Sequence, residues 1–506
     1  MDALERDDSN DDAGIEASVA LAASTGVDTS VHLRPWIVNV LCRYALGARM
    51  CGRQIVEFVS DTVVVYPVAH HLAFFHTETR AMDFLQSTQS VQSVQSFHVS
   101  ANREHLAVAE VLQPSPTSGT VYTPLKPGGS TSLQSTHMRD HRHSQHVVSI
   151  YRLSTRSRQK MITLPHNASV VSCCFSSDNK FLAMLEEAPA HNVTYWKVST
   201  GKMIASCKCP SRGSRIFINP NNPSYISVSG PMILKYWLWT NNDFRIGNFL
   251  PQTREQEHFV DHIWLKEYMV AVSERGMLLT FRSTTDNSAV DLVHASRCHQ
   301  PSYVRLECLA GHAKGFVLGG SAGFFSLYEN TDDPKDPFAF VRTVSVGEVA
   351  FECISVSPNH EAIVACTKSQ EMLCLSMNAI ETVQEDRVGY KELLRNGNQL
   401  GAIIQGDVCL SRPIFATIGM DKTVRLWNIE LRAYDVMHQC AEEPMALSLH
   451  PTGFQVLVTF KERIRLFHIL QETLRQVREL PVKNCRAVKF SGGGHLFACA
   501  AGLAVS

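Results

Sequence analysis

The chain has 506 residues, of which 44% are hydrophobic and 19% are charged, so it is long enough to bury a large core in two or more domains. Lysine plus arginine (47) nearly balances aspartate plus glutamate (48), which leaves a formal net charge of −1. Because that balance gives no overall attraction for a polyanion, we expect no nucleic-acid partner. No apolar run reaches the roughly 18 residues that a membrane-spanning helix needs, and we expect no membrane insertion.

Residues 1–35 form an acidic N-terminal segment, and residues 1–30 contain no aromatic side chain. Such a segment cannot bury enough apolar surface to fold, so we predict that it is disordered. It also lacks the basic and apolar regions of a secretory signal peptide. The fifteen cysteines are therefore expected to be reduced thiols of an intracellular protein.

The first apolar segment, residues 55–75, has the pattern of β-strands and is predicted to open a first repeat. A second repeat is expected around Phe97. It is interrupted by residues 113–146, a stretch rich in serine, proline and histidine. We predict that this stretch is a loop inserted between two strands of one blade, on the rim, where it can bind partners or be modified.

Similar short units then recur along the rest of the chain. Eight strand-end residues mark them and span 315 residues, a mean spacing of 45; they are Phe175, Phe217, Ile263, Leu309, Val356, Leu410, Leu449 and Phe490. WD-type propeller blades repeat at about 40 to 45 residues. With the two earlier units, the sequence predicts nine complete repeats and a tenth that stops at Ser506.

Ten repeats exceed the four to eight blades of an ordinary ring. We therefore predict an all-β fold with one WD-type β-propeller of about seven blades over residues 36–400 and the beginning of a second over residues 401–506. Residues 381–398 are the expected junction, although they could equally be a long loop within one blade. The unfinished second ring suggests a fragment or a shortened form of a longer protein.

The most regular unit is residues 413–428, PIFATIGMDKTVRLWN. Gly419 is expected to allow a tight turn between two strands, and the Asp421 carboxylate to accept backbone N–H bonds that hold this turn. Trp427 ends the second strand, where WD repeats carry tryptophan. Trp196 and Trp237 recur at the ends of comparable strands, so all five residues are interpreted as structural positions of the repeat.

Two segments imitate catalytic motifs. Residues 319–323 (GGSAG) match the pattern of a serine-hydrolase nucleophile elbow, but an alternating strand follows instead of the helix that an elbow requires. Residues 199–202 (STGK) resemble the end of a phosphate-binding loop, yet the first glycine and the magnesium-binding hydroxyl are missing. Both are predicted to be turns.

Histidines and cysteines also suggest a metal site without completing one. His141, His143 and His146 are close in sequence but lie in a loop-like segment without a fixed fourth ligand. Cys207 and Cys209 have no second pair nearby. We therefore predict no catalytic residue, no cofactor, no metal site and no small-molecule substrate.

Three consecutive segments resemble the middle of the cilia- and flagella-associated protein 57 family of WD-repeat proteins. They are residues 413–428, residues 442–470 (EEPMALSLHPTGFQVLVTFKERIRLFHIL) and residues 485–502 (CRAVKFSGGGHLFACAAG). Residues 175–198 and 354–377 fit the same pattern, so the resemblance covers roughly residues 36–506. Members have tandem propellers followed by a long coiled coil, and this chain lacks the coiled coil and the rest of the second propeller.

The resemblance implies a non-enzymatic scaffold of the ciliary or flagellar axoneme, with a cytoplasmic pool, that helps assemble or anchor inner dynein arms. Its expected partners are axonemal proteins such as inner-arm dyneins or proteins of the microtubule doublet. The alternative is a cytosolic WD-repeat adaptor, either a ubiquitin-ligase substrate receptor or a ribosome-assembly factor. A propeller hydrolase is disfavoured because no clustered catalytic set is visible. The sequence does not indicate which face of the propeller binds.

Overall fold

The computed structural model describes residues 45, 55–85, 91–113, 144–165, 167–189, 191–241, 243–250, 257–283, 290–299, 305–382, 387–394, 402–502 and 504–505. These residues form nine four-stranded sheets, one three-stranded sheet and one short helix, α1 (Met377–Thr382). The predicted all-β class is confirmed, as are the nine complete repeats and the shorter tenth. The predicted disorder of residues 1–35 falls outside the described residues, as does most of the 113–146 insertion.

Every sheet is a run of consecutive antiparallel strands, and the sheets are numbered here in chain order. Sheets 1 to 3 contain β1 (Glu57–Phe58), β2 (Val63–Val68), β3 (His71–His76) and β4 (Met82–Phe84); β5 (Val91–Val99), β6 (His105–Leu112), β7 (Gln145–Arg152) and β8 (Ser157–Thr163); β9 (Val170–Phe175), β10 (Phe181–Glu186), β11 (Asn192–Lys197) and β12 (Lys202–Lys208). Sheets 4 and 5 contain β13 (Arg215–Ile218), β14 (Tyr225–Gly230), β15 (Ile233–Thr240) and β16 (Asp243–Asn248); β17 (Phe259–Leu265), β18 (Tyr268–Ser273), β19 (Met277–Ser283) and β20 (Val290–Arg297).

The remaining sheets follow the same order. Sheets 6 and 7 contain β21 (Leu306–His312), β22 (Gly315–Gly320), β23 (Phe324–Asn330) and β24 (Phe338–Ser345); β25 (Phe351–Val356), β26 (Ala362–Thr367), β27 (Met372–Ser376) and β28 (Lys391–Leu394). Sheets 8 to 10 contain β29 (Ile403–Val408), β30 (Ile414–Gly419), β31 (Thr423–Asn428) and β32 (Ala433–Gln439); β33 (Ala446–Leu449), β34 (Gln455–Thr459), β35 (Ile464–Ile469) and β36 (Leu474–Leu480); β37 (Cys485–Phe490), β38 (Phe497–Ala501) and β39 (Ala504–Val505).

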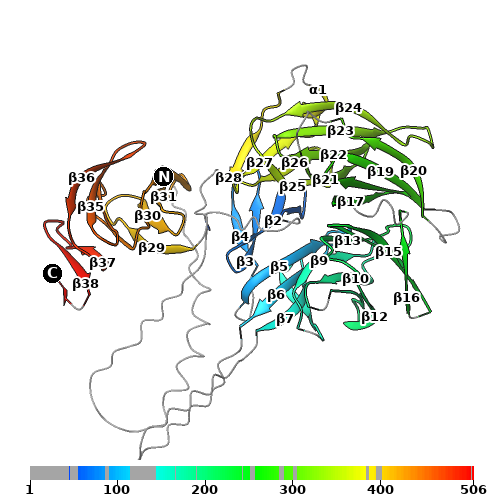
Figure 1. Ribbon diagram of the computed structural model, residues 1–506, viewed down its shortest axis with the longest axis horizontal. Helices are drawn as coiled ribbons and strands as arrows, with labels where there is room; N and C mark the ends of the chain where they lie inside the picture. The colour runs from blue at the N-terminus through cyan, green and yellow to red at the C-terminus, as the bar shows by residue number, and fades with distance from the viewer. Residues whose placement is uncertain are drawn as a thin grey trace, which may run out of the picture. The chain divides into compact units, whose positions relative to one another are not determined.

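Sheets 1 to 7 pack face to face in a closed cycle. A hydrophobic core lies between each consecutive pair of these sheets. A further core joins the last sheet to the first, where Phe58 and Phe75 of sheet 1 pack with Val364 and Leu394 of sheet 7. Figure 1 shows the same closure, with the yellow strands β27 and β28 beside the blue strands of sheet 1. A ring of four-stranded antiparallel sheets is the β-propeller architecture, and closure leaves no sheet face of the ring uncovered.

Side chains of one sheet also cap the first strand of the next. The N–H of Val99 in sheet 2 donates to Glu57 Oε2 of sheet 1 at 2.6 Å. The contact that closes the ring is of the same kind, since the N–H of Phe58 in sheet 1 donates to Ser355 Oγ of sheet 7 at 3.3 Å. These bonds satisfy N–H groups that would otherwise be unpaired at the inner edge of each sheet.

Sheets 8 to 10 form their own series of packed sheets. One core lies between sheets 8 and 9, and another lies between sheets 9 and 10. The capping bond recurs here, because the N–H of Phe490 in sheet 10 donates to Ser448 Oγ of sheet 9 at 3.1 Å. The blade-to-blade packing of the first seven sheets therefore continues in this part of the chain.

Two sequence-based expectations need correction. Leu410, expected to end the first strand of sheet 8, lies after β29 and is 98% exposed. Within residues 381–398, the expected junction, β28 pairs with β27 and so belongs to sheet 7. For its described residues, the alternative of a connection within one blade is therefore the correct one, and the next sheet starts at Ile403.

Candidate functional site: turns, an ion-pair network and a groove

The turn between β30 and β31 is held by Asp421. Its Oδ1 atom accepts hydrogen bonds from the backbone N–H of Thr423 at 3.1 Å and from the Thr423 hydroxyl at 2.7 Å. Its Oδ2 atom lies 3.3 Å from Nη2 of Arg425, and the two side chains are only 9% and 5% exposed. Asp421 therefore neutralises a buried guanidinium in addition to closing a turn.

Gly419 begins the turn between β30 and β31. It is the last residue of β30, and its carbonyl oxygen accepts the Lys422 N–H at 3.1 Å to close the turn. The residue of this turn with a positive φ is Lys422, at 61°. The left-handed conformation is thus adopted by a lysine, in a turn that the Asp421 carboxylate stabilises.

The three tryptophans of the repeat all lie in the third strand of their sheets and are buried. Trp427 donates from Nε1 to the Thr417 hydroxyl at 2.7 Å. Among the described residues, the Nε1 atoms of Trp196 and Trp237 have no hydrogen-bond partner. The strand register explains the difference, because the position that Thr417 occupies in sheet 8 is occupied by Met184 in sheet 3 and by Val228 in sheet 4.

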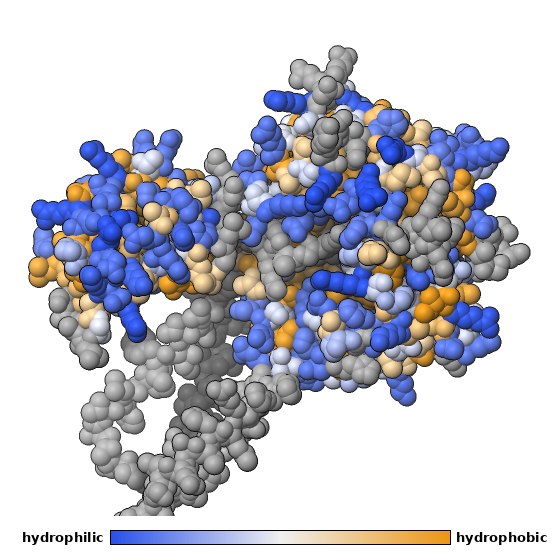
Figure 2. Space-filling view, in the orientation of Figure 1, coloured by the Kyte–Doolittle hydropathy of each residue, from blue (hydrophilic) through white to orange (hydrophobic). Residues whose placement is uncertain are grey.

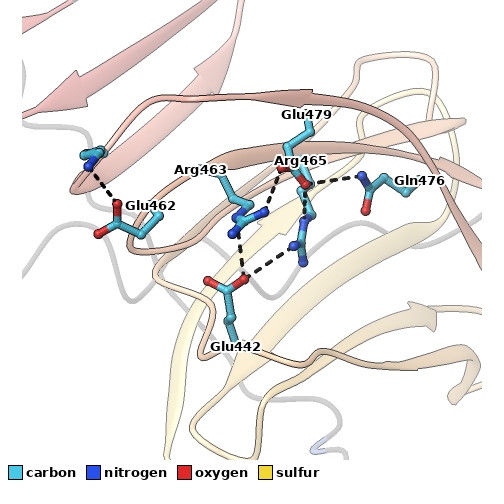
Figure 3. Close-up of polar contacts among 7 residues, drawn as sticks. Glu442, Glu462, Arg463, Arg465, Gln476 and Glu479 are labelled. Carbon is cyan, nitrogen blue, oxygen red and sulfur yellow. Dashed lines mark hydrogen bonds and ion pairs between the residues drawn. The ribbon is translucent and has the colours of Figure 1, made fainter.

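An ion-pair network occupies the corresponding turn of sheet 9 (Figure 3). This turn is one residue shorter than the turn of sheet 8, and its carboxylate, Glu462, pairs with Lys483 at 3.1 Å. Arg463 and Arg465 instead share two glutamates. Glu479 lies 2.8 Å from Arg463 and 3.0 Å from Arg465, and Glu442 lies 3.5 and 3.4 Å from the same two arginines.

The network joins the turn before β35 to the end of β36 and to the connection between β32 and β33 (Figure 3). A hydrogen bond from Arg465 lowers the pKa of the Glu479 carboxyl, and Arg463 contributes to the same shift. Exposed ion pairs are individually weak, but a network of shared partners holds several side chains in place. Since these charges neutralise one another, the network braces sheet 9 and presents little unpaired charge to a partner.

A large groove lies at the opposite end of the sheets from the Asp421 type of turn. It has a volume of about 1050 Å³ and is lined by the turns between first and second strands of sheets 4, 5 and 6, together with the connection between β23 and β24. We call it the 4–5–6 groove. Its lining includes Trp264, Tyr268, Arg282, His312, Asp332 and Asp333.

The aromatic side chains of the groove are fixed by neighbours. Trp264 donates from Nε1 to Ser227 Oγ of sheet 4 at 2.9 Å. The Tyr268 ring packs edge-on against Phe338, with ring centroids 5.8 Å apart, and the Arg282 guanidinium lies 5.7 Å from the Tyr268 centroid. Both aromatic residues are half-buried, so part of each fixed ring remains accessible in the groove.

The charges of the groove are unevenly paired. Arg282 forms an ion pair with Glu267 at 3.3 Å. Asp332 and Asp333 are exposed and form no ion pair with any other described residue. Burial lowers the pKa of His312, so this imidazole is neutral at neutral pH and contributes no positive charge to the groove.

The other sequence candidates lie in structural positions. Ser321 is in the hairpin turn between β22 and β23, and Gly201 is in the turn before β12 with a φ of 66°. Cys207 and Cys209 are free thiols. His146 is in β7, whereas His141 and His143 lie outside the described residues.

The described part of the chain contains neither a cluster of metal-binding side chains nor a helix that could span a membrane. No group of three or more histidine, cysteine, aspartate or glutamate side chains there is arranged to hold a metal ion. No helix there has both the length and the apolar character needed to cross a membrane.

Comparison with known proteins places these features in context. Cilia- and flagella-associated protein 57 of Mus musculus is 22% identical over 515 aligned residues, which cover 91% of this chain. Two Tetrahymena thermophila proteins, cilia- and flagella-associated proteins 57 A and 57 C, are 26% and 27% identical over 63% and 49% of the chain. The chain is similar to cilia- and flagella-associated protein 57 over most of its own length. The resemblance read from the sequence is thereby confirmed.

The homology covers only part of these relatives. The chain spans 38% of the mouse protein and 26% and 21% of the two Tetrahymena proteins. No protein-family model matches the chain. Among solved structures, the β-propeller domain of Cps50 (Swd1) from Myceliophteria thermophila aligns with a TM-score of 0.45 at 11% identity, over 68% of this chain and 98% of that one.

Proposed function

We propose that this protein is a non-enzymatic scaffold of the ciliary or flagellar axoneme that helps assemble or anchor inner dynein arms. The observation that carries the proposal is the similarity, over 91% of the chain, to a protein named for its association with cilia and flagella. Polar side chains of the described residues, such as Asp421 and Thr417, hold turns and strands together, which supports a binding role over a catalytic one. Figure 2 shows a largely hydrophilic face with scattered hydrophobic areas, as suits a protein that binds through loops and rims.

The proposed architecture is a seven-bladed propeller followed by the start of a second one. Sheets 1 and 7 already pack against each other, so the first ring has no open position for another blade. Sheets 8 to 10 pack on one another in the same manner and need a separate ring to cover their outer faces. Two propellers in tandem offer several loop surfaces at fixed positions, which is what a scaffold for several axonemal proteins requires.

The proposal is tested by disrupting the gene in motile ciliated cells and measuring the composition of isolated axonemes by quantitative mass spectrometry. The expected result is a partial loss of inner-arm dyneins with outer-arm dyneins retained, together with impaired beating. Restoring the intact gene should recover both. Normal beating with an unchanged dynein composition would refute the axonemal role, and accumulation of ligase substrates or of unprocessed ribosomal RNA would favour a cytosolic adaptor.

A further inference from the structure

We propose that the 4–5–6 groove binds an extended segment of a partner protein in which a lysine or arginine lies close to an apolar residue. The inference goes beyond the axonemal role, because it assigns a particular surface and a chemistry of partner. It uses the proposed function only in supposing that the partner is a protein.

The size of the groove favours a polypeptide over a small molecule. Pockets for small ligands have volumes of about 300 to 1,000 Å³ and enclose most of the ligand surface. The 4–5–6 groove, at about 1050 Å³, lies at the upper limit of that range, and it runs across turns from three sheets. An extended segment of several residues can contact all three turns at once, whereas a compact ligand cannot.

The half-buried Trp264 and Tyr268 provide the apolar contact. The Trp264 N–H is already bonded to Ser227, so it requires no polar partner from a ligand. Tyr268 is held by Phe338 on one side and by Arg282 on the other. Side chains held in this way lose little conformational entropy on binding, and aromatic residues of this kind dominate the energetics of protein interfaces.

Asp332 and Asp333, which we call the acidic wall of the groove, favour a basic residue in the partner. Asp332 and Asp333 lie on a short connection that is closed by the Thr331 N–H donating to the Pro337 carbonyl oxygen at 2.9 Å. Asp333 Oδ1 accepts the Lys335 N–H at 2.9 Å, which fixes that carboxylate. Covering these carboxylates without a counter-charge is costly, so a stable partner brings a lysine or an arginine to them.

The remaining charges do not cancel this requirement. Arg282 is paired with Glu267, and the pKa of His312 is lowered by burial, so neither supplies a free cation to the acidic wall. Among the charged side chains that line the groove, Lys266 is the one cation without an ion pair to another described residue, whereas two carboxylates, Asp332 and Asp333, have none. The groove therefore carries a net negative charge.

The test is a selection of random 12-residue peptides, displayed on phage, against the full 506-residue chain. We expect the recovered peptides to be enriched in lysine or arginine within a few positions of leucine, proline or an aromatic residue. A synthetic peptide from the strongest clone should bind at least tenfold more weakly when Asp332→Asn and Asp333→Asn are combined. It should also bind more weakly as NaCl is raised from 0.05 to 0.5 M, because exposed charge pairs are screened.

Two further variants make the test specific. Ala313→Phe places a bulky side chain at an exposed turn residue of the groove and should abolish peptide binding without altering the core. Glu430→Gln combined with Glu472→Gln removes two exposed carboxylates outside the groove and should leave binding unchanged. Thermal unfolding of each variant checks that the fold is retained.

Recovered peptides without basic enrichment would overturn the proposal. The proposal would also be overturned if every recovered peptide bound the unmodified chain and the Ala313→Phe variant equally well. Equal binding to the unmodified chain and to the combined Asp332→Asn, Asp333→Asn variant would overturn it as well. These outcomes are independent of the axoneme experiment, because peptide selection requires no cilium. Failure of one proposal is therefore distinguishable from failure of the other.

Discussion

Replacing Asp421 with alanine should destabilise sheet 8 far more than removal of an ordinary turn aspartate. The change deletes two hydrogen bonds to Thr423, each worth about 1 kcal/mol. It also removes the carboxylate beside Arg425, whose side chain is only 5% exposed. Breaking a buried ion pair from one side costs about 3 to 5 kcal/mol, and this cost overlaps with that of the hydrogen bonds that the same carboxylate accepts, so we expect a loss of at least about 3 kcal/mol in the local free energy of unfolding.

A matched control is Asp178→Ala in the turn between β9 and β10. Asp178 likewise accepts a backbone N–H, from Lys180 at 3.1 Å, and a hydroxyl, from Ser176 at 2.6 Å. Its ion-pair partner Lys180 is 72% exposed and stays hydrated when the carboxylate is lost. This variant should therefore cost only about 1 kcal/mol.

The assay is hydrogen exchange followed by mass spectrometry on peptides that cover residues 414–428. A loss of about 3 kcal/mol corresponds to exchange on the order of a hundredfold faster in β30 and β31. Adding Arg425→Met to Asp421→Ala should recover part of the loss, because the buried charge is then removed as well. Unchanged exchange in residues 414–428, or equal effects of Asp421→Ala and Asp178→Ala on their own sheets, would refute the reasoning.

Three further predictions concern polar side chains in the cores. Burial and the nearby Arg215 lower the pKa of His262 to about 3, below its unfolded value, so the free energy of unfolding should fall as pH drops from about 6.5 toward 3. In denaturant titrations at several pH values, the free energy of unfolding of the unmodified chain should fall by up to about 1.4 kcal/mol per pH unit more than that of His262→Gln. The same pH dependence in both proteins would contradict the lowered pKa of His262. Thr417→Val should cost about 1 to 3 kcal/mol in denaturant unfolding, since Trp427 loses its acceptor; a neutral result would mean that the bond is dispensable. Val228→Thr should change the free energy of unfolding by less than about 1 kcal/mol, because the new hydroxyl can accept a hydrogen bond from the Trp237 N–H, which has no partner. A loss as large as that of Thr417→Val would argue that Val228 does not occupy the position that Thr417 has in sheet 8.

The sequence predicts the repeat well because the first strand of most sheets is apolar and buried. Phe97, Phe175 and Phe490 all lie in first strands, and their spacing reveals the blades without any knowledge of contacts. The prediction for Leu410 was wrong because an apolar residue that follows an exposed strand cannot be distinguished in the sequence from an apolar residue that ends a buried strand. The sequence locates the turn that begins at Gly419, but it does not show that Lys422 is the residue with the positive φ.

The candidate sites were beyond reach of the sequence because their parts are far apart along the chain. Trp264 lies in β17, His312 ends β21 and Asp332 lies in the connection after β23, so these residues meet only through the curvature of the ring. The sequence shows that Glu462 is the acidic residue of the corresponding turn in sheet 9. It does not reveal that Glu442 and Glu479, from other elements, are the arginine partners. No local motif contains either arrangement.

The central claim, an axonemal scaffold, is tested most directly by locating the tagged product of the intact gene in motile ciliated cells. After the ciliary membrane is removed with detergent, we predict that the tagged protein remains on the isolated axonemes and is distributed along their length. A protein that is released with the soluble fraction, or that is found only in the cytosol or the nucleolus, would contradict the account.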